Sequence, residues 1–279
     1  MIEGFLGKIE SKLGNLLYYP GCLTKFTLPE IEENYRKILK YLEVEFISID
    51  EFYCCGSPVK NAGYREDFNN LIEKHTALLK KYNITRIVTN CPSCAEVLNK
   101  YYHVDVQHFT AFVQPYIKKG FLKDIPKKKD EKGQNEKIIY HDSCHLGRGL
   151  GLYDEPRDII KLLGYDLVEF SQNRQVSLCC GAGGGLKNNF PDIANNNAAK
   201  KILDAKIFGA DKIVTACPMC YKHFLDNIGL AKSKSKKKDR TVTEKTVFEK
   251  KDEMQNEEEY FRSFELSQLI VRELHLNRT

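Results

Sequence analysis

The chain has 279 residues, of which 42% are hydrophobic and 29% charged, and a formal net charge of +5 at pH 7. Its length suits one large domain or two smaller ones, and its excess lysines lie in solvated segments, which argues against a nucleic-acid partner. The sequence has no apolar run near the roughly 20 residues of a membrane span and no secretion signal at its start, so we expect a cytoplasmic protein. In that compartment we expect the ten cysteines to bind metal rather than to form disulfides.

The first predicted element is an amphipathic helix over residues 1–15, because apolar side chains recur there at helical spacing. This helix either packs on its own domain or docks a partner subunit, which could itself be membrane-bound. The first domain, residues 16–118, alternates short apolar strands with amphipathic helices. His75 lies on an apolar helical stripe and is interpreted as a packed histidine. The predicted strands are 16–19, 44–49, 84–88 and 104–106, and the predicted helices are 31–42, 68–79, 95–102 and one from Thr110 onward.

Residues 119–137, rich in lysine, glycine and acidic side chains, are predicted to form a linker. The second domain, residues 138–279, then repeats the order of the first. A run of lysines followed by glutamates near residues 230–260 cannot bury a core and is predicted to be a surface loop. The predicted strands are 138–140, 166–170 and 212–214, and the predicted helices follow Pro156 and cover 192–208 and 221–228.

The cysteines follow the same repetition. Cys22 and Cys144 are 122 positions apart, Cys54 and Cys179 are 125 apart, and Cys91 and Cys217 are 126 apart. Such near-constant offsets indicate an internal duplication. The predicted fold class is therefore α/β, with two pseudo-symmetric Rossmann-like halves and parallel sheets. Ligands bind at the carboxyl ends of the strands in such sheets, and several of the cysteines directly follow predicted strands.

Each half contains one cysteine, a Cys-Cys-Gly motif and a Cys-Pro-x-Cys pair, separated by 31 and 35 residues in the first half and by 34 and 36 in the second. The pair opens a helix, whose dipole favours thiolates. Structural zinc uses four ligands and a thioredoxin-like dithiol uses two, so each leaves cysteines over. The contiguous cysteine run of a ferredoxin is absent. An iron–sulfur cluster that uses all five is the most economical interpretation, with a zinc-binding structural or interaction protein as the alternative.

Four motifs carry a family resemblance: Tyr-Tyr-Pro-Gly-Cys at 18–22, Cys-Cys-Gly-Ser-Pro at 54–58, His-Asp-Ser-Cys-His-Leu-Gly-Arg at 141–148 and Cys-Cys-Gly-Ala-Gly-Gly-Gly at 179–185. They are similar to the signatures of the Cys-Cys-Gly (CCG) domain family. That family includes the B subunit of heterodisulfide reductase, the catalytic part of its D-type form, and iron–sulfur subunits of glycolate, lactate and glycerol-3-phosphate oxidation. The resemblance covers all but the N-terminal helix and the charged loop. Ser143 departs from it, since relatives usually have proline there.

The resemblance implies one non-cubane 4Fe-4S cluster for each five-cysteine set, at the interface of the halves. It also implies reduction of a small-molecule disulfide, such as CoM-S-S-CoB, to two thiols by one-electron steps. The electron donor would be a ferredoxin-like iron–sulfur subunit or a flavoprotein, and a partner subunit would provide any membrane association. The alternative is electron transfer in a flavin-linked 2-hydroxyacid or glycerol-3-phosphate dehydrogenase complex. The implied ligands are Cys22, Cys54, Cys55, Cys91 and Cys94 for one cluster and Cys144, Cys179, Cys180, Cys217 and Cys220 for the other.

Other residues near the motifs are weaker candidates. The glycine run at 181–185 lacks the Gly-Lys-Ser/Thr of a phosphate loop, and is better explained by backbone N–H groups that approach cluster sulfur. His141 and His145 flank Cys144, either as proton donors to a released thiolate or as structural neighbours of the ligands. Three cations either hold an anionic substrate or are simply solvated: Arg148, Lys60 and Lys187.

Overall fold

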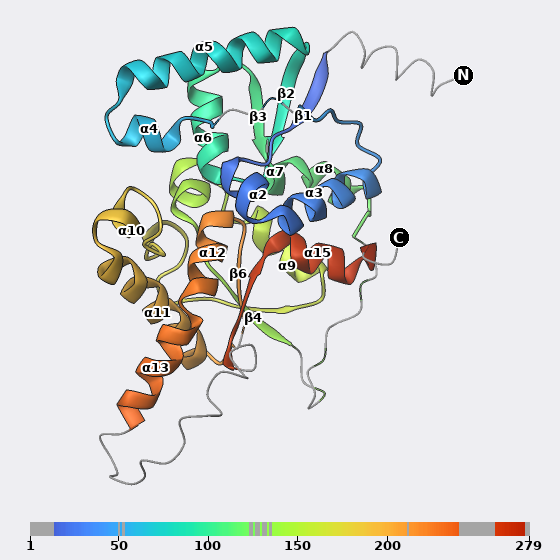
Figure 1. The fold of residues 1–279 in the computed structure, drawn as a ribbon. Coiled ribbons are helices and arrows are strands. Elements are labelled where there is room, and N and C mark those ends of the chain that lie inside the picture. The colour runs from blue at the N-terminus through green and yellow to red at the C-terminus, as the bar shows by residue number, and fades with distance from the viewer. Residues whose placement is uncertain are drawn as a thin grey trace.

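The computed structural model describes residues 14–49, 51, 54–122, 125, 129, 133, 136–210, 212–239 and 260–276. These residues form two α/β halves, the first coloured blue to green and the second light green to red (Figure 1). The predicted N-terminal helix lies outside the described residues except for its last two positions. The second of these, Asn15, already belongs to strand β1, so a helix does not extend that far.

The first half is built on a parallel sheet in the order β1–β2–β3. The predicted strand at 44–49 is wrong in extent, because only Ile47 joins the sheet, through a single parallel bridge to Leu17. This segment lies at the outer edge of β1, where it has one neighbouring strand and so gains few ladder hydrogen bonds. The strands are β1 (Asn15–Tyr18), β2 (Ile84–Thr89) and β3 (Asp105–His108).

The helices of the first half agree with the apolar periodicity. Proline occupies the first position of α3 and α6, where its missing N–H would have had no partner. The helix predicted from Thr110 begins one residue earlier, with His108 as its cap: Nδ1 accepts a hydrogen bond from the Thr110 N–H at 3.3 Å. The helices are α2 (Cys22–Thr27), α3 (Pro29–Tyr41), α4 (Ser57–Asn61), α5 (Arg65–Lys81), α6 (Pro92–Tyr101), α7 (Phe109–Phe112) and α8 (Gln114–Lys118).

The second half repeats this arrangement in a parallel sheet of order β5–β4–β6–β7. If the bridge at Ile47 is counted as the counterpart of β5, the two sheets have the same strand order, which confirms the predicted pair of α/β halves with parallel sheets. The strands are β4 (Lys137–Tyr140), β5 (Asp166–Val168), β6 (Lys212–Thr215) and β7 (Arg262–Glu265). The helices are the π-helical η1 (His145–Gly149), α9 (Glu155–Leu162), the 3-10 helix η2 (Arg174–Val176), α10 (Leu186–Asn189), α11 (Pro191–Ile207), α12 (Pro218–Asp226), α13 (Ile228–Asp239) and α15 (Leu266–Glu273).

The segment predicted as a charged loop from residue 230 is helical at its start. α13 continues to Asp239 and packs against α11, with Ala231 fully buried. Alanine and lysine both favour helix, so the lysine run prolongs a helix that Ile228 and Ala231 anchor. The rest of that predicted loop, residues 240–259, lies outside the described residues. In the part of the chain that is described, no helix is both long and apolar enough to cross a membrane.

A central core joins the two halves. Residues of β1, α3 and α7 pack there against residues of β4, α9 and α15. Tyr35 of α3 makes one contact between the halves, because its hydroxyl donates to Glu265 Oε1 at 2.6 Å. Within its own half the Tyr35 ring meets Phe109 edge-on, with 4.6 Å between centroids. Two further cores, one in each half, contain buried cysteines. The halves therefore pack as one body, with cysteines set into the core of each.

Candidate metal centres

The five cysteines of each half gather beyond the carboxyl ends of the parallel strands. Cys22 follows β1 and opens α2. Cys91 follows β2 as the N-cap of α6, and Cys94 lies in the first turn of that helix. The adjacent pair Cys54 and Cys55 lies just before α4. The second half places its five cysteines in the same way, and all ten side chains are free thiols.

Within each half the thiols form one continuous chain of neighbours whose pKa values depend on one another. The chain runs through Cys22, Cys54, Cys55, Cys94 and Cys91 in the first half, and through Cys144, Cys179, Cys180, Cys220 and Cys217 in the second. The sulfurs of Cys180 and Cys220 are 3.2 Å apart. Because the order is the same in both halves, the repetition seen in the sequence extends to side-chain contacts. We call these two groups the first and second cysteine sets.

Each set contains a strongly acidic thiol at the first position of its Cys-Cys-Gly motif, and the first set has a second thiol with a lowered pKa, Cys91. Hydrogen bonds from the thiols of Cys22 and Cys55 hold the pKa of Cys54 far below its ordinary value. Equivalent hydrogen bonds lower the pKa of Cys179 in the second half. The hydrogen bonds to Cys54 and Cys179 raise the pKa of the donor thiols, Cys22 in the first half and Cys144 in the second. Each set therefore has at least one cysteine that favours the thiolate, the form in which cysteine binds metal.

The glycine of each Cys-Cys-Gly motif allows the chain to approach the sulfurs. Gly56 donates its N–H to Cys54 Sγ at 3.5 Å, and Gly181 donates to Cys179 Sγ at 3.4 Å. Both glycines have left-handed backbones, with φ of 86° and 92°. A Cβ would lie 2.6 Å from the Phe68 ring in the first case and 2.9 Å from a backbone oxygen of α11 in the second. The N–H of Gly181 thus points at a cysteine sulfur, and the predicted approach of such groups to cluster sulfur stays a prediction.

Crossed helix contacts bring the two cysteine sets to the boundary between the halves. α6, which carries one Cys-Pro-x-Cys pair, packs against η1 of the other half, which starts directly after Cys144. α12, which carries the other pair, packs against α2, which starts at Cys22. A hydrogen bond of 2.5 Å between His145 Nδ1 on η1 and Glu96 Oε2 on α6 joins the first of these contacts. Each set thus lies close to helices of both halves.

Comparison with known families agrees with this duplicated arrangement. The cysteine-rich domain named CCG matches the chain twice, at residues 16–99 and 138–225. The chain belongs to the CCG family. The resemblance predicted from the four motifs is therefore confirmed.

Three relatives of this CCG chain are named as oxidoreductases or as subunits of them. It is 30% identical over 232 residues to the D subunit of the dihydromethanophenazine:CoB–CoM heterodisulfide reductase of Methanosarcina acetivorans, an alignment that covers 78% of this chain and 55% of that one. It is 30% identical to the B subunit of the fumarate reductase (CoM/CoB) of Methanothermobacter marburgensis, with 81% and 45% covered. It is 28% identical to the EtfAB:quinone oxidoreductase of Syntrophomonas wolfei, with 80% and 32% covered. The chain spans about half the length of the first two relatives.

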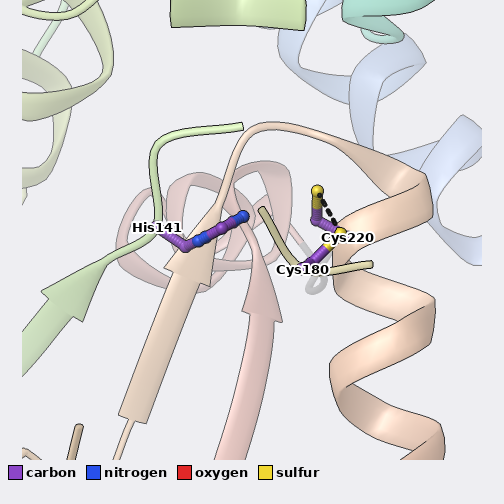
Figure 2. A group of neighbouring side chains, drawn as sticks. All are labelled: His141, Cys180 and Cys220. Atoms are coloured by element: carbon purple, nitrogen blue, oxygen red, sulfur yellow. Dashed lines mark hydrogen bonds between the residues drawn. The ribbon is translucent and has the colours of Figure 1, made fainter. Parts of the chain in front are cut away.

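His141, at the end of β4, lies beside the second cysteine set (Figure 2). Its fully buried ring meets Phe224 edge-on, with 4.9 Å between centroids. One ring nitrogen and the sulfurs of Cys180 and Cys220 all lie within 4.8 Å of one another. Neither ring nitrogen has a hydrogen-bond partner among the described residues. Burial and the nearby Lys201 ammonium lower the pKa of His141 to about 3, so the ring is neutral at physiological pH.

The other candidates from the motif region make contacts with the protein itself. His145 is partly exposed, and its partner is the Glu96 carboxylate. Arg148 Nη1 donates to the backbone oxygens of Ser177 at 2.9 Å and Gln175 at 3.2 Å. Arg148 therefore holds the segment that leads into the second Cys-Cys-Gly motif.

The two lysines that were candidates for anion binding lie in ordinary surface contacts. Lys60 Nζ lies 5.8 Å from the centroid of the Tyr101 ring, and Lys187 pairs with Asp226 at 3.2 Å on the surface. Neither contact differs from that of a solvated lysine. The structure thus brings His141 and His145 to the cysteine sets and leaves Lys60 and Lys187 in surface roles.

A buried lysine of the second half was missed from the sequence. Lys201 on α11 is only 3% exposed, and its Nζ lies 3.7 Å from the centroid of Phe170. Burial lowers its pKa to about 8. Its counterpart 126 positions earlier is His75, which is packed as predicted, with Nε2 donating to the Cys54 backbone oxygen at 3.0 Å. The offset of 126 is also that of the Cys-Pro-x-Cys pairs, so aligning the repeats residue by residue would have found Lys201.

A second residue that was missed, Arg157, fixes the loop in which the second cysteine set begins. Its guanidinium donates to both oxygens of Asp142, at 2.7 and 2.8 Å, and to both oxygens of Glu169, at 2.7 and 2.8 Å. The side chains of Arg157 and Asp142 are 2% and 3% exposed. Since Asp142 lies two residues before Cys144, this buried pair sets the path of the backbone toward the first ligand of that half.

Proposed function

We propose that this CCG chain is the part of an oxidoreductase that reduces a small-molecule disulfide to two thiols. The observation that supports the proposal is the pair of complete five-thiol chains at the boundary between the halves. Each cysteine set would hold one non-cubane 4Fe-4S cluster. The ligands would be Cys22, Cys54, Cys55, Cys91 and Cys94 in the first half and Cys144, Cys179, Cys180, Cys217 and Cys220 in the second.

The residues present fit such clusters. Thiolates are the ligands that iron–sulfur clusters take, and five of them in one connected group exceed the four of a closed zinc site. Cys55, Cys94, Cys180 and Cys220 are buried, so the protein excludes water from one side of each site. When bound, the clusters would supply the two electrons that cleave the S–S bond, one electron from each.

Reduction of one disulfide to two thiols also consumes two protons, and His145 is well placed to deliver them. It directly follows Cys144, and its side chain is partly exposed to solvent. Glu96 holds Nδ1 at 2.5 Å, which leaves Nε2 for proton transfer. Because Glu96 lies on the helix that carries Cys91 and Cys94, this pair stands between the two cysteine sets and can carry protons from solvent to the place where the thiols form.

The electrons come from outside the two cysteine sets. All ten cysteines of the chain belong to these sets, so none is left to bind an ordinary ferredoxin cluster. A ferredoxin-like iron–sulfur subunit or a flavoprotein would supply the electrons, and a membrane-bound partner would provide any contact with a membrane. The Methanosarcina relative is named for a CoB–CoM heterodisulfide, which makes a CoM-S-S-CoB-like substrate the first to test.

Anaerobic reconstitution with iron and sulfide tests this function. We expect bound iron and acid-labile sulfide in equal amounts, and release of two thiols from CoM-S-S-CoB when reduced viologen supplies electrons. The matched control is His145→Gln, which leaves all ten cysteines in place: it should keep its clusters and release thiols more slowly. Zinc without sulfide in the protein would contradict the proposal and favour a structural zinc protein.

One relative favours electron relay as a second candidate function. The Syntrophomonas protein is named as an oxidoreductase between EtfAB and quinone. In that role the chain would pass electrons from a flavin-linked dehydrogenase toward a quinone and would make no bonds itself. Clusters that reoxidise with a quinone analogue, in a protein that releases no thiol from disulfides, would establish the relay function instead.

A further inference from the structure

The His141 ring is a buried polar group without a protein partner. Leaving a buried hydrogen-bonding group unpaired costs about 1–3 kcal/mol, and native proteins normally pair such groups. Within the described part of the chain both ring nitrogens of His141 lack a partner. By contrast, the equally buried His223 bonds through Nε2 to the Ala194 backbone oxygen at 3.1 Å. His141 is therefore available to a group other than the protein.

The ring faces the sulfurs of the second cysteine set. It extends from the end of β4 toward Cys180 and Cys220, whose sulfurs lie within 4.8 Å of a ring nitrogen (Figure 2). The edge-on contact with Phe224 restricts its rotation, so this direction is fixed by packing. A neutral imidazole carries one N–H, which can donate to sulfur.

The first half indicates that the ring is not needed to complete the ligand set. Tyr19 precedes Cys22 by three residues, as His141 precedes Cys144. With tyrosine at this position, the first half assembles the same chain of five thiols as the second. The imidazole is therefore an addition to a complete set of thiolates rather than a replacement for one of them.

We propose that His141 donates a hydrogen bond from its ring N–H to a sulfur of the cluster held by the second cysteine set. The inference rests on the cluster binding of the proposed function. A hydrogen bond to sulfur stabilises the reduced, more negative state, so it raises the reduction potential. At this place the first half has Tyr19, whose donor is a hydroxyl and not a ring N–H, so this contribution of an imidazole belongs to the second cluster.

The experiment compares His141→Leu, which removes the donor, with His141→Gln, which offers an amide N–H in its place, in the reconstituted full chain. In a redox titration followed by EPR, the reduction equilibrium constant of one cluster should fall about tenfold in His141→Leu, as expected for one charge-assisted hydrogen bond. That factor is a decrease of about 59 mV for one electron. His141→Gln should restore most of the decrease. The matched control His223→Gln, a buried histidine already paired with the protein, should leave both potentials unchanged.

Iron and sulfide analysis distinguishes the ways in which the inference can fail. A wild-type protein without a cluster at the second cysteine set contradicts the proposed function itself. If His141→Leu keeps its full iron content and its reduction potentials do not shift, the proposed hydrogen bond is wrong and the proposed function is not affected. Loss of the second cluster in both His141 variants would make His141 an iron ligand and overturn the assignment.

A measurement on the unsubstituted protein does not depend on how the variants fold. In protein labelled with 15N-histidine, pulsed EPR of the reduced second cluster should show the weak nitrogen coupling of a hydrogen-bonded ring. A strong coupling, typical of nitrogen bound to iron, or no coupling at all, would overturn the proposal.

Discussion

The two halves present the same chain of five thiols in different surroundings. Tyr19 and His75 lie beside the first cysteine set, whereas His141 and Lys201 occupy the equivalent positions beside the second. Strand order and sulfur contacts are repeated, while the charge and the hydrogen-bonding capacity of the neighbouring side chains are not. Duplication has thus preserved the ten cysteines and has changed the side chains that surround them. Two sites for the same kind of group can thereby acquire different properties.

Removing one proposed ligand, in the first half or in the second, should have the largest effect on iron content and on thiol release. The two variants test whether the two sites are independent. Cys55 and Cys180 are equivalent buried members of the two sets. Each serine variant should lose the cluster of its own half and keep the other, because sulfur contacts exist within a set whereas contacts between the halves are made by other residues, such as His145 and Glu96. Iron analysis and EPR measure this: each variant should keep about half of the iron and lose thiol release.

The two single variants are controls for each other. If Cys55→Ser or Cys180→Ser removed all the iron, the halves would bind their clusters cooperatively, and the picture of two separate sites would be wrong. If one of them retained disulfide reduction, a single cluster would suffice for the reaction and the proposed one-electron contribution from each side would fail.

The next largest effect on stability concerns two arginines at equivalent positions of the two halves. Arg36 and Arg157 lie over tyrosines of equivalent strands, 5.4 Å from the Tyr18 centroid and 5.1 Å from that of Tyr140. Arg157→Met should lower the free energy of unfolding by about 3–5 kcal/mol, because it leaves buried Asp142 without its counter-charge. Arg36→Met should cost less than about 1 kcal/mol, since the pair it forms on helix α3 is partly exposed, with side chains 25% and 16% accessible.

Urea unfolding of the two variants under the same conditions measures this difference. Equal losses would show that burial of the ion pair is not what distinguishes the halves. In Arg157→Met the second cluster should also be lost at lower urea concentration than the first, because Asp142 holds the backbone just before Cys144. Simultaneous loss of both clusters would contradict a local role for the arginine.

The sequence predicted those features that depend on local pattern. Apolar periodicity located α3, α5 and α6, and the repeated spacing of ten cysteines indicated two pseudo-symmetric α/β halves. The strand at 44–49 failed because an edge strand depends on how its one neighbour pairs, which local periodicity does not show. The start of the charged loop failed because its helix is anchored by the packing of Ala231 on α11.

The surroundings of the cysteine sets could not be predicted from local pattern. Lys201 is preceded by the exposed Lys200, and a lysine in such a run is normally solvated. Its burial follows from the small side chains of Ala198 and Ala205 on the same helix, which leave room for its stem near Phe170. The missing partners of His141 likewise depend on what every neighbouring segment does, and only a three-dimensional arrangement shows that.

Two helix caps should have a smaller effect on stability, and the pH dependence of that effect should have opposite signs in the two halves. His108 caps α7 at the end of β3, and Glu265 caps α15 at the end of β7, each accepting a backbone N–H of its own helix. Both side chains are buried at the central core. Burial lowers the pKa of His108 from 6.5 to about 4, and it raises the pKa of Glu265 from 4.5 to about 7. At this position of the repeat, burial disfavours the positive charge of His108 in the first half and the negative charge of Glu265 in the second.

The signs of the pH dependence follow from these shifts. The folded protein binds the proton of His108 more weakly than the unfolded chain does, so stability from this residue is present above pH 6.5 and is lost as the pH falls toward 4. Glu265 holds its proton more tightly in the folded protein, so its contribution is present below pH 4.5 and is lost as the pH rises toward 7. Each contribution amounts to at most about 3 kcal/mol.

Conservative variants separate the two contributions because they keep the caps. Glu265→Gln retains the oxygen that accepts from Ser267, and its stability relative to wild type should increase as the pH rises from 4.5 to 7. His108→Asn retains an acceptor for Thr110, and its stability relative to wild type should increase as the pH falls from 6.5 to 4. Urea midpoints measured across this range should therefore diverge in opposite directions for the two variants. Parallel profiles would mean that the two caps sit in electrostatically equivalent surroundings, and the contrast between the halves would then be confined to the neighbours of the cysteines.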